Sequence, residues 1–324
     1  MARVLVIGGT LFIGRALVEM LLERGDDVVI MHRGSGTPFG DRVDEIRCDR
    51  NDVAAVRDAL AGNRFDVVYD NVYDFQHGTT GDQVRAAAVA ASEGLGRYVF
   101  MSSVAVYGAG EFDERGPLVP SDFPNPYSAH KADSERALFE LHHSAGLPVT
   151  TLRPAFVYGP HNAIDREAWF WDRLLAGRPI IIPDDGSRTM QWVHSHDVAR
   201  AAMLAASADV AIGKAYNLAN HPPVTQVEYV ELLARVAGTP ARLTRVPRGT
   251  IEQAGGQLFA PPFYFGVYLD LPPITVRPDG ARSDLGLELT PMEEGLRETY
   301  RWYREQQRPE PDYTWEDRLL ASVR

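Results

Sequence analysis

Cysteine, lysine and long apolar runs are scarce in this sequence of 324 residues. The single cysteine, Cys48, excludes an intramolecular disulfide and leaves no cysteine cluster for a structural metal. No apolar run is long enough to span a bilayer, and the N-terminal segment lacks the small-residue cleavage pattern of a secretory signal. We therefore expect a cytoplasmic protein with no membrane partner.

Positive charge is scarce as well, because 33 Lys and Arg face 44 Asp and Glu, which gives a net charge of -11. Proteins bind nucleic-acid phosphates largely through Lys and Arg that displace counterions, and no long basic run offsets the deficit here. We predict no nucleic-acid partner and expect a small-molecule substrate. A hydrophobic content of 45% is that of an ordinary globular protein.

Short β-branched runs alternate with helical stretches in the first half of the chain. The runs are residues 4–7, 28–31, 67–69 and 98–101. Between the first two, apolar residues recur at helical spacing over residues 12–24, so that one helix face can pack on a sheet. This order predicts an α/β fold with a doubly wound parallel sheet of the Rossmann type.

The second half is richer in proline and aromatic residues, which predicts a smaller, interleaved substrate-binding domain. We assign residues 1–155 to the dinucleotide-binding domain, to which residues 190–220 return. The substrate-binding domain then comprises residues 156–189 and 221–307. Residues 308–324 are polar, and we interpret them as a solvated tail that ends in a short surface helix.

A glycine turn joins the first predicted strand to the first predicted helix. Gly8 and Gly14 have the outer spacing of Gly-x-x-Gly-x-x-Gly, with Leu11 at the middle position. Unpaired N–H groups and the positive end of the helix dipole would there meet a pyrophosphate, which the Leu11 side chain would shift slightly. The residues expected at the cofactor are Gly8, Thr10, Leu11, Phe12, Ile13 and Gly14. A turn without a ligand is the alternative.

The end of the second strand reads His32-Arg33, where an acidic residue would bind the adenosine ribose of NAD. A guanidinium suits a 2′-phosphate, so the sequence favours NADP over NAD; a solvated arginine is the alternative. Asp49, after the third strand, is placed to accept a hydrogen bond from the adenine amine. It could equally cap the helix that opens near Asp52.

Two motifs carry the chemistry: Ser-x-x-x-Tyr-Gly from Ser103, and Tyr127-x-x-x-Lys131. With the glycine turn and the segments at 152–160 and 192–199, they resemble the extended short-chain dehydrogenase/reductase family, which contains NAD-dependent nucleotide-sugar epimerases and dehydratases. The resemblance covers nearly the whole chain. Because the chain has only two lysines, an accidental Tyr-x-x-x-Lys is improbable.

The spacing suits acid–base chemistry, because residues four apart share a helix face and the Lys131 ammonium can lie beside the Tyr127 phenol. We expect that charge, together with that of oxidised nicotinamide, to bring the pKa of Tyr127 down towards working pH. The resemblance implies that Tyr127 is the general acid/base, that Lys131 also reaches the nicotinamide ribose, and that Ser103 binds the reacting oxygen. We interpret Ser102 as structural.

Departures from the family pattern bear on the reaction. Val104 and Ala105 stand where dehydratases carry an acidic pair, which argues against 4,6-dehydration. Met190 replaces the arginine that grips a nucleotide diphosphate in sugar epimerases, and Arg188 is the nearest substitute. We expect Ser103, Val104 and Arg188 at the substrate. The leading hypothesis is a reductase or dehydrogenase of a sugar-like substrate; a 4-epimerase that retains NAD is the alternative.

Other segments bear on the cofactor and on a further hypothesis. Asp70 begins Asp-Asn-Val-Tyr-Asp after the fourth strand, so Asp70, Val72 and Tyr73 would face the cofactor, and Phe156 would lie near the nicotinamide or in ordinary core. The loop Gly-Gly-Thr-x-Phe-Ile-Gly also resembles family members that bind RNA or lack oxidoreductase activity, but the acidic charge and the intact trio favour an enzyme.

His194 and His196 have a metal-like i, i+2 spacing, and His142 and His143 form another pair, but neither comes with a third ligand in a zinc pattern. We therefore predict no metal site. The resemblance implies a homodimer through the helices after the fourth and fifth strands, here residues 82–92 and 127–143.

Overall fold

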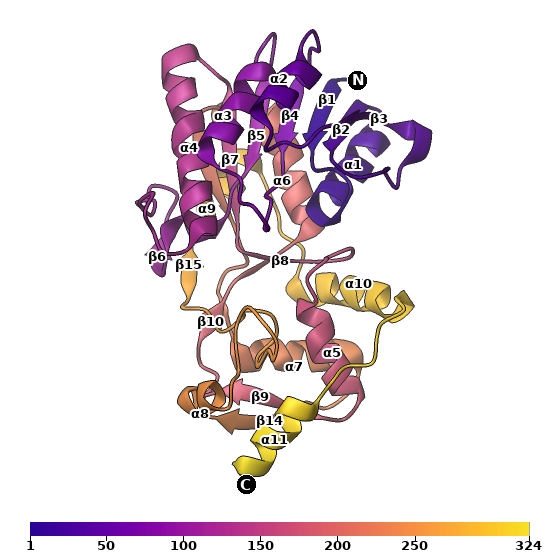
Figure 1. The fold of residues 1–324 in the computed structure, drawn as a ribbon, viewed down its shortest axis with the longest axis vertical. Helices are drawn as coiled ribbons and strands as arrows, with labels where there is room; N and C mark the ends of the chain where they lie inside the picture. Colours follow the sequence, from indigo (N-terminus) through magenta and orange to yellow (C-terminus); the bar gives the residue numbers. More distant parts are fainter. Residues whose placement is uncertain (324) are drawn as a thin grey trace.

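Seven parallel strands form the central sheet of the first domain in the computed structural model, which describes residues 1–323 (Figure 1). Their order, β12-β7-β5-β4-β1-β2-β3, switches direction between β4 and β1. The strands are β1 (Arg3–Ile7), β2 (Asp27–His32), β3 (Asp44–Arg47), β4 (Val67–Asp70), β5 (Arg97–Met101), β7 (Val149–Pro154) and β12 (Lys214–Leu218). The four predicted runs correspond to β1, β2, β4 and β5, and the predicted fold class is confirmed.

Helices cover both faces of this sheet. Along β1, Val4 and Val6 pack in the cluster that includes α1, α6 and α9, whereas Leu5 and Ile7 pack in the cluster that includes α2, α3 and α4. Successive side chains of a strand point to opposite faces, so a strand buried on both sides has a continuous apolar sequence. The helices are α1 (Phe12–Arg24), α2 (Val53–Leu60), α3 (Gly81–Ala90), α4 (Pro126–Ala145), α6 (Ser195–Ser207) and α9 (Asp279–Leu285).

The second domain lies below the first in Figure 1 and is built from short strand pairs and helices. Its core is aromatic, and Trp192 stacks on Tyr229 with ring centroids 4.2 Å apart. The strands are β8 (Phe156–Tyr158), β9 (Pro179–Pro183), β10 (Thr189–Met190), β11 (Trp192–His194), β13 (Val224–Thr225) and β14 (Arg242–Val246). The helices are α5 (Arg166–Leu175), α7 (Gln226–Ala237), α8 (Arg248–Gln253), α10 (Met292–Glu305) and α11 (Thr314–Ser322).

The chain crosses between the two domains more than once. β11 pairs with β8, and the chain then passes through α6 into β12, which lies beside β7 in the main sheet. The short pair β6 (Gly110–Phe112) and β15 (Ile274–Val276) joins a loop of the first domain to a late segment. The path is interleaved, but it differs from the proposed boundaries in two places, because Trp192 of β11 packs in the core of the second domain and α9 packs on the sheet of the first. No helix within residues 1–323 is both long and apolar enough to cross a membrane.

The C-terminal segment packs on the second domain, so our interpretation of it as a solvated tail was wrong. Leu319 and Leu320 of α11 are buried, and so is the Glu316 carboxylate, which accepts two hydrogen bonds of 2.8 Å from the Arg173 guanidinium. That guanidinium also lies 3.5 Å from the centroid of the Trp169 ring. The polar composition concealed the contacts, because the partners of α11 lie about 140 residues earlier in the chain.

We predict that Glu316→Ala lowers the free energy of unfolding by about 3 kcal/mol, because it leaves the buried Arg173 guanidinium without its counter-charge. Urea denaturation of the wild type and the variant measures this difference. Glu310→Ala is the control, since Glu310 is exposed in the same segment, and it should change the stability by less than about 0.5 kcal/mol. Equal losses in the two variants would show that the ion pair does not hold the tail.

Candidate active site

The turn between β1 and α1 is closed tightly by its glycines. Gly8 has a φ of +87°, and a Cβ at Gly14 would lie 1.9 Å from the Gly8 carbonyl oxygen, so a side chain cannot enter there. Leu11 is extended and 63% exposed, which directs its side chain away from the packed turn. Phe12, with a φ of +47°, begins the helix, and Thr10 and Ile13 are partly buried beside it.

The N-terminus of α1 differs from those of α2, α3 and α4. Side chains of Asp52, Thr80 and Asn125 cap α2, α3 and α4, whereas no side chain caps α1 and its first turn holds no acidic residue. The first N–H groups of a helix need partners and carry a partial positive charge. An uncapped helix behind a glycine turn fits the pyrophosphate of a dinucleotide.

Of the two basic residues at the end of β2, only Arg33 has an exposed charged group. His32 is buried, and its Nε2 lies 2.7 Å from the Glu45 carboxylate while its Nδ1 accepts the Gly34 N–H at 3.1 Å. The Arg33 guanidinium donates to the Asp74 carboxylate at 2.6 Å. Both ring nitrogens of His32 therefore have partners within the protein, which leaves neither of them for the expected contact with a 2′-phosphate.

Asp49 is exposed and lies at the same end of the sheet. Its carboxylate accepts the Asn51 N–H at 2.9 Å and lies 4.0 Å from the Arg33 guanidinium. The capping alternative falls instead to Asp52, whose carboxylate accepts the Ala55 N–H at 2.9 Å. Asp49 is therefore free of a capping role and contributes negative charge near Arg33.

Asp70 lies inside the protein rather than on an open groove. Its carboxylate pairs with the Arg50 guanidinium and accepts a hydrogen bond of 2.8 Å from the Tyr98 hydroxyl. Only 1% of the residue is exposed. The expected contact with the cofactor is therefore replaced by an internal ion pair at the end of β4.

Two residues of the proposed catalytic trio, Tyr127 and Lys131, lie beside the ring of Tyr73, and the third, Ser103, lies beside Tyr127. Tyr127, on the first turn of α4, has its ring centroid 4.8 Å from that of Tyr73, and its hydroxyl is hydrogen-bonded to Ser103 at the end of β5. The Lys131 ammonium lies 5.6 Å from the Tyr73 centroid and donates to the Met101 carbonyl at 2.6 Å.

The glycine turn lies against the residue before Tyr73. A Cβ at Gly8 would meet the side chain of Val72. The glycine turn and the trio therefore both lie next to the segment formed by Val72 and Tyr73. Ser102, interpreted as structural, is buried next to Ser103.

Burial changes the pKa values of the two titratable members in opposite directions. It raises the pKa of the Tyr127 phenol to about 12, although the hydrogen bond from Ser103 and the charge of Arg166 act against the rise. It lowers the pKa of the Lys131 ammonium to about 8, which Asp70 opposes. Desolvation of the phenol outweighs the effects of Ser103 and Arg166, and the expectation that Lys131 and oxidised nicotinamide together lower the Tyr127 pKa stays a prediction.

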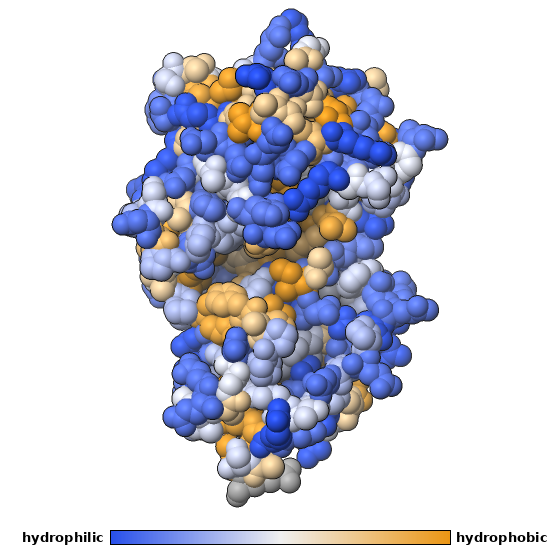
Figure 2. Space-filling model, in the orientation of Figure 1, coloured by the Kyte–Doolittle hydropathy of each residue, from blue (hydrophilic) through white to orange (hydrophobic). Residues whose placement is uncertain are grey.

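Aromatic side chains from both domains surround Tyr127. Phe75, which is 76% exposed, stacks on its ring with centroids 5.6 Å apart. Tyr268 of the second domain lies near the Tyr127 phenol, and its ring centroid is 6.2 Å from that of Phe156 and 5.8 Å from that of the exposed Phe259. Figure 2 shows apolar surface on both sides of a hollow between the domains. Phe156, expected near the nicotinamide, belongs to this aromatic group.

Arg166 belongs to the same group, although no sequence motif contains it. Its guanidinium donates to the Tyr268 hydroxyl at 2.8 Å and to the Val157 carbonyl at 2.8 Å, while its Nε is buried without a partner in the described residues. Only the fold brings α5 next to residues 156–158. A motif search finds α4 and the glycine turn but not this arginine.

The two remaining predicted substrate residues lie in different surroundings. Val104 is buried beside Ser103 and packs in a small apolar cluster with Val106 and Val119. Arg188 lies in the second domain, where its guanidinium is 3.3 Å from the buried Asp270 carboxylate. Val104 therefore belongs to the hydrophobic core next to the trio. Arg188 forms an ion pair with the buried Asp270.

Comparison with known proteins gives matches over most of the chain. Residues 4–219 match the model of the NAD dependent epimerase/dehydratase family. The 2-alkyl-3-oxoalkanoate reductase of Stenotrophomonas maltophilia is 32% identical over 263 residues, which cover 74% of this chain and 76% of that protein. The chloroplast stem-loop binding protein of 41 kDa b of Arabidopsis thaliana is 30% identical over 252 residues, which cover 74% of this chain but only 64% of that protein.

Solved structures resemble nearly the whole chain. The UDP-glucose 4-epimerase of Thermus thermophilus, in complex with NAD, is 25% identical and has a TM-score of 0.73. The match covers 94% of this chain and 99% of that one. The similarity therefore extends beyond the sheet into the second domain.

We predict that Lys131→Met changes how stability depends on pH. In the wild type the buried ammonium loses its proton near pH 8, whereas an unfolded lysine keeps it until about pH 10.4. The folded state therefore binds fewer protons than the unfolded state in this window, so the wild type gains stability as pH rises from 8 to 10. Urea denaturation should show the wild type gaining about 2 kcal/mol relative to the variant. Parallel stability curves would mean that Lys131 titrates normally.

Proposed function

The chain belongs to the NAD dependent epimerase/dehydratase family, and we propose that it transfers a hydride between nicotinamide and a secondary alcohol or ketone of a sugar-like substrate. The observation that carries this proposal is the position of Tyr127 and Lys131 beside Tyr73, with Ser103 next to Tyr127 and the glycine turn against the preceding residue, Val72. Bound NAD would supply the nicotinamide carbon that gives or takes the hydride. The turn from Gly8 to Gly14 and the N-terminus of α1 would hold its pyrophosphate.

The protonation states favour ketone reduction. A phenol with a pKa of about 12 is protonated at neutral pH, so Tyr127 is ready to donate a proton to an oxygen that becomes an alkoxide. Ser103 would hold that oxygen through its hydroxyl. Lys131, with a pKa of about 8, is mainly charged at neutral pH and would stabilise the phenolate left after the proton has moved.

The aromatic surroundings support a substrate with an apolar or ring-shaped face. Phe75, stacked on Tyr127, and Phe259, stacked on Tyr268, are both mostly exposed, and such rings stack on flat apolar surface. A relative that reduces 2-alkyl-3-oxoalkanoates supports a ketone, and a structural neighbour named as a UDP-glucose epimerase supports a nucleotide sugar. For a nucleotide sugar, Arg188 would bind the diphosphate and exchange part of its contact with Asp270.

A 4-epimerase that retains NAD is the second candidate, and the similarity to the Thermus thermophilus epimerase favours it. The two functions differ in whether the cofactor is consumed. RNA binding, which the name of the chloroplast relative suggests, is opposed by the net charge of -11.

We also propose a homodimer in the cytoplasm. α3 and α4 pack together, and Val89 on α3 leaves 54% of its surface exposed, which a second copy would cover. The single cysteine is buried and unpaired, as suits a reducing compartment.

We predict that Tyr127→Phe lowers turnover about a thousandfold with little change in dinucleotide affinity, because it removes the donated proton but keeps the ring. NADH oxidation is followed with a 2-alkyl-3-oxoalkanoate, and formation of the 4-epimer is followed with UDP-glucose and no net change in nicotinamide absorbance. The first signal identifies the reductase and the second the epimerase. Tyr300→Phe, on the partly exposed face of α10, is the control. Near-normal turnover of Tyr127→Phe in either assay would exclude the proposed role.

The charges around Arg33, at the end of β2 where the adenosine ribose would bind, favour NAD, although the sequence alone favoured NADP. Arg33 faces the carboxylates of Asp74 and Asp49, and the two carboxylates would repel a 2′-phosphate. We predict that the wild type binds NAD at least about tenfold more tightly than NADP. Asp49→Asn should narrow this difference, because it removes one negative charge beside Arg33. Fluorescence titration with each dinucleotide tests both statements, and tighter NADP binding by the wild type would restore the original preference.

A further inference from the structure

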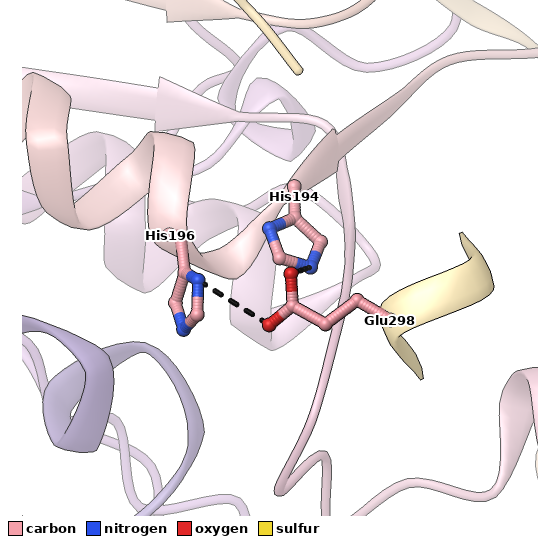
Figure 3. A group of neighbouring side chains, drawn as sticks. All are labelled: His194, His196 and Glu298. Carbon is pink, nitrogen blue, oxygen red and sulfur yellow. Dashed lines mark ion pairs between the residues drawn. The ribbon is translucent and has the colours of Figure 1, made fainter. Parts of the chain in front are cut away.

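A cluster of two histidines and a glutamate lies where the two domains meet. His194 ends β11, His196 lies on the first turn of α6, and Glu298 comes from α10, about a hundred residues later in the chain (Figure 3). The ligand-type atoms of the three side chains all lie within 4.8 Å of one another. The sequence showed the histidine pair, but only the packing of α10 beside β11 brings the carboxylate to it.

The distances leave room for an ion between these groups. The His196 Nδ1 lies 3.5 Å and the His194 Nε2 lies 4.0 Å from the nearest Glu298 carboxylate oxygen. Both separations are longer than a hydrogen bond of about 2.9 Å. Two ligand atoms, each about 2.1 Å from a tetrahedral ion, are about 3.4 Å apart. A modest movement of the partly exposed Glu298 side chain would complete this geometry.

His194 is fixed in place but lacks a partner. Only 1% of the residue is exposed, and its Nε2 has no hydrogen-bond partner among the described residues. Glycines at 159 and 295 allow the ring to fit, because a Cβ at either position would lie 3.2 Å or 3.1 Å from a ring atom. Buried polar atoms in proteins almost always have a partner. An orphaned nitrogen directed at a carboxylate and a second imidazole is the arrangement that a metal ion would satisfy.

The local charges are compatible with a cation. Arg200 places a positive charge near His194. The Arg200 charge is itself balanced by Asp197. Glu298 supplies the negative charge at the centre of the cluster.

We propose that His194, His196 and Glu298 bind a transition-metal dication of the Zn²⁺ type. Two imidazoles and one carboxylate favour zinc over magnesium or calcium, which prefer oxygen ligands. The side chains of His196 and Glu298 are each 36% exposed, so water can complete the coordination. Because α10 belongs to the second domain and α6 covers the sheet of the first, the ion joins the domains (Figure 1).

The test uses Zn²⁺ alone on chelator-treated protein. Calorimetry should show one site with a dissociation constant of about 10 µM or tighter, and saturating Zn²⁺ should raise the unfolding midpoint by about 3 °C. His196→Ala and Glu298→Ala should each weaken binding about tenfold or more and remove the shift. His143→Ala is the control, since His143 belongs to the other histidine pair and bonds only the Phe139 carbonyl through Nδ1.

Two results would overturn the proposal. One is wild-type Zn²⁺ affinity in both His196→Ala and Glu298→Ala, with the metal-free midpoint and circular dichroism confirming that the variants are folded. The other is the absence of a Zn²⁺ site in the wild type, which would make the cluster an ordinary histidine–carboxylate pair. Co²⁺ gives an independent readout, because nitrogen and oxygen ligands produce a visible absorption band that His196→Ala should reduce and His143→Ala should not.

Discussion

Two buried charges on one face of α4 fix the position of the proposed active site. The Lys131 ammonium donates to the Met101 carbonyl at the end of β5. One turn later, the Glu135 carboxylate accepts hydrogen bonds of 2.9 and 3.1 Å from the Nε of Arg153 on β7. A buried charge is tolerated only with a partner, so α4 cannot slide along the sheet without unpairing both. Tyr127, one turn before Lys131, is thereby held over the end of β5, where Ser103 follows.

The burial that holds these groups also sets their proton affinity. Removing a phenol from water raises its pKa, and removing an ammonium lowers its pKa, so the pKa values of Tyr127 and Lys131 move apart on the pH scale. The helical spacing of the motif predicts that the two side chains are neighbours, but it contains no information about solvent. With its phenol protonated, Tyr127 can donate a proton to a substrate oxygen, whereas the sequence pattern suggested a phenolate.

What the sequence predicts well is local or repeated along the chain. Strands buried on both faces appear as continuous apolar runs, and the glycines at 8 and 14 follow from the steric needs of one turn. What it misses are pairings between distant residues, such as His32 with Glu45, Arg33 with Asp74, and Arg173 with Glu316. In each pair, a side chain that the sequence suggested was available to a ligand or to solvent makes a contact within the protein instead. The approach of α10 to the histidine pair has the same character.

The scarcity of lysine fits this pattern of pairing. In the second domain, arginines form fork-shaped contacts with buried carboxylates, as Arg173 does with Glu316 and Arg248 with Asp270. A planar guanidinium makes two parallel hydrogen bonds, which an ammonium cannot do. The Lys131 ammonium instead lies 4.7 Å from the Phe100 ring centroid and 2.6 Å from one carbonyl, in a space that suits a compact charge. At this buried position of α4, lysine supplies a compact charge, which the planar fork of an arginine would not.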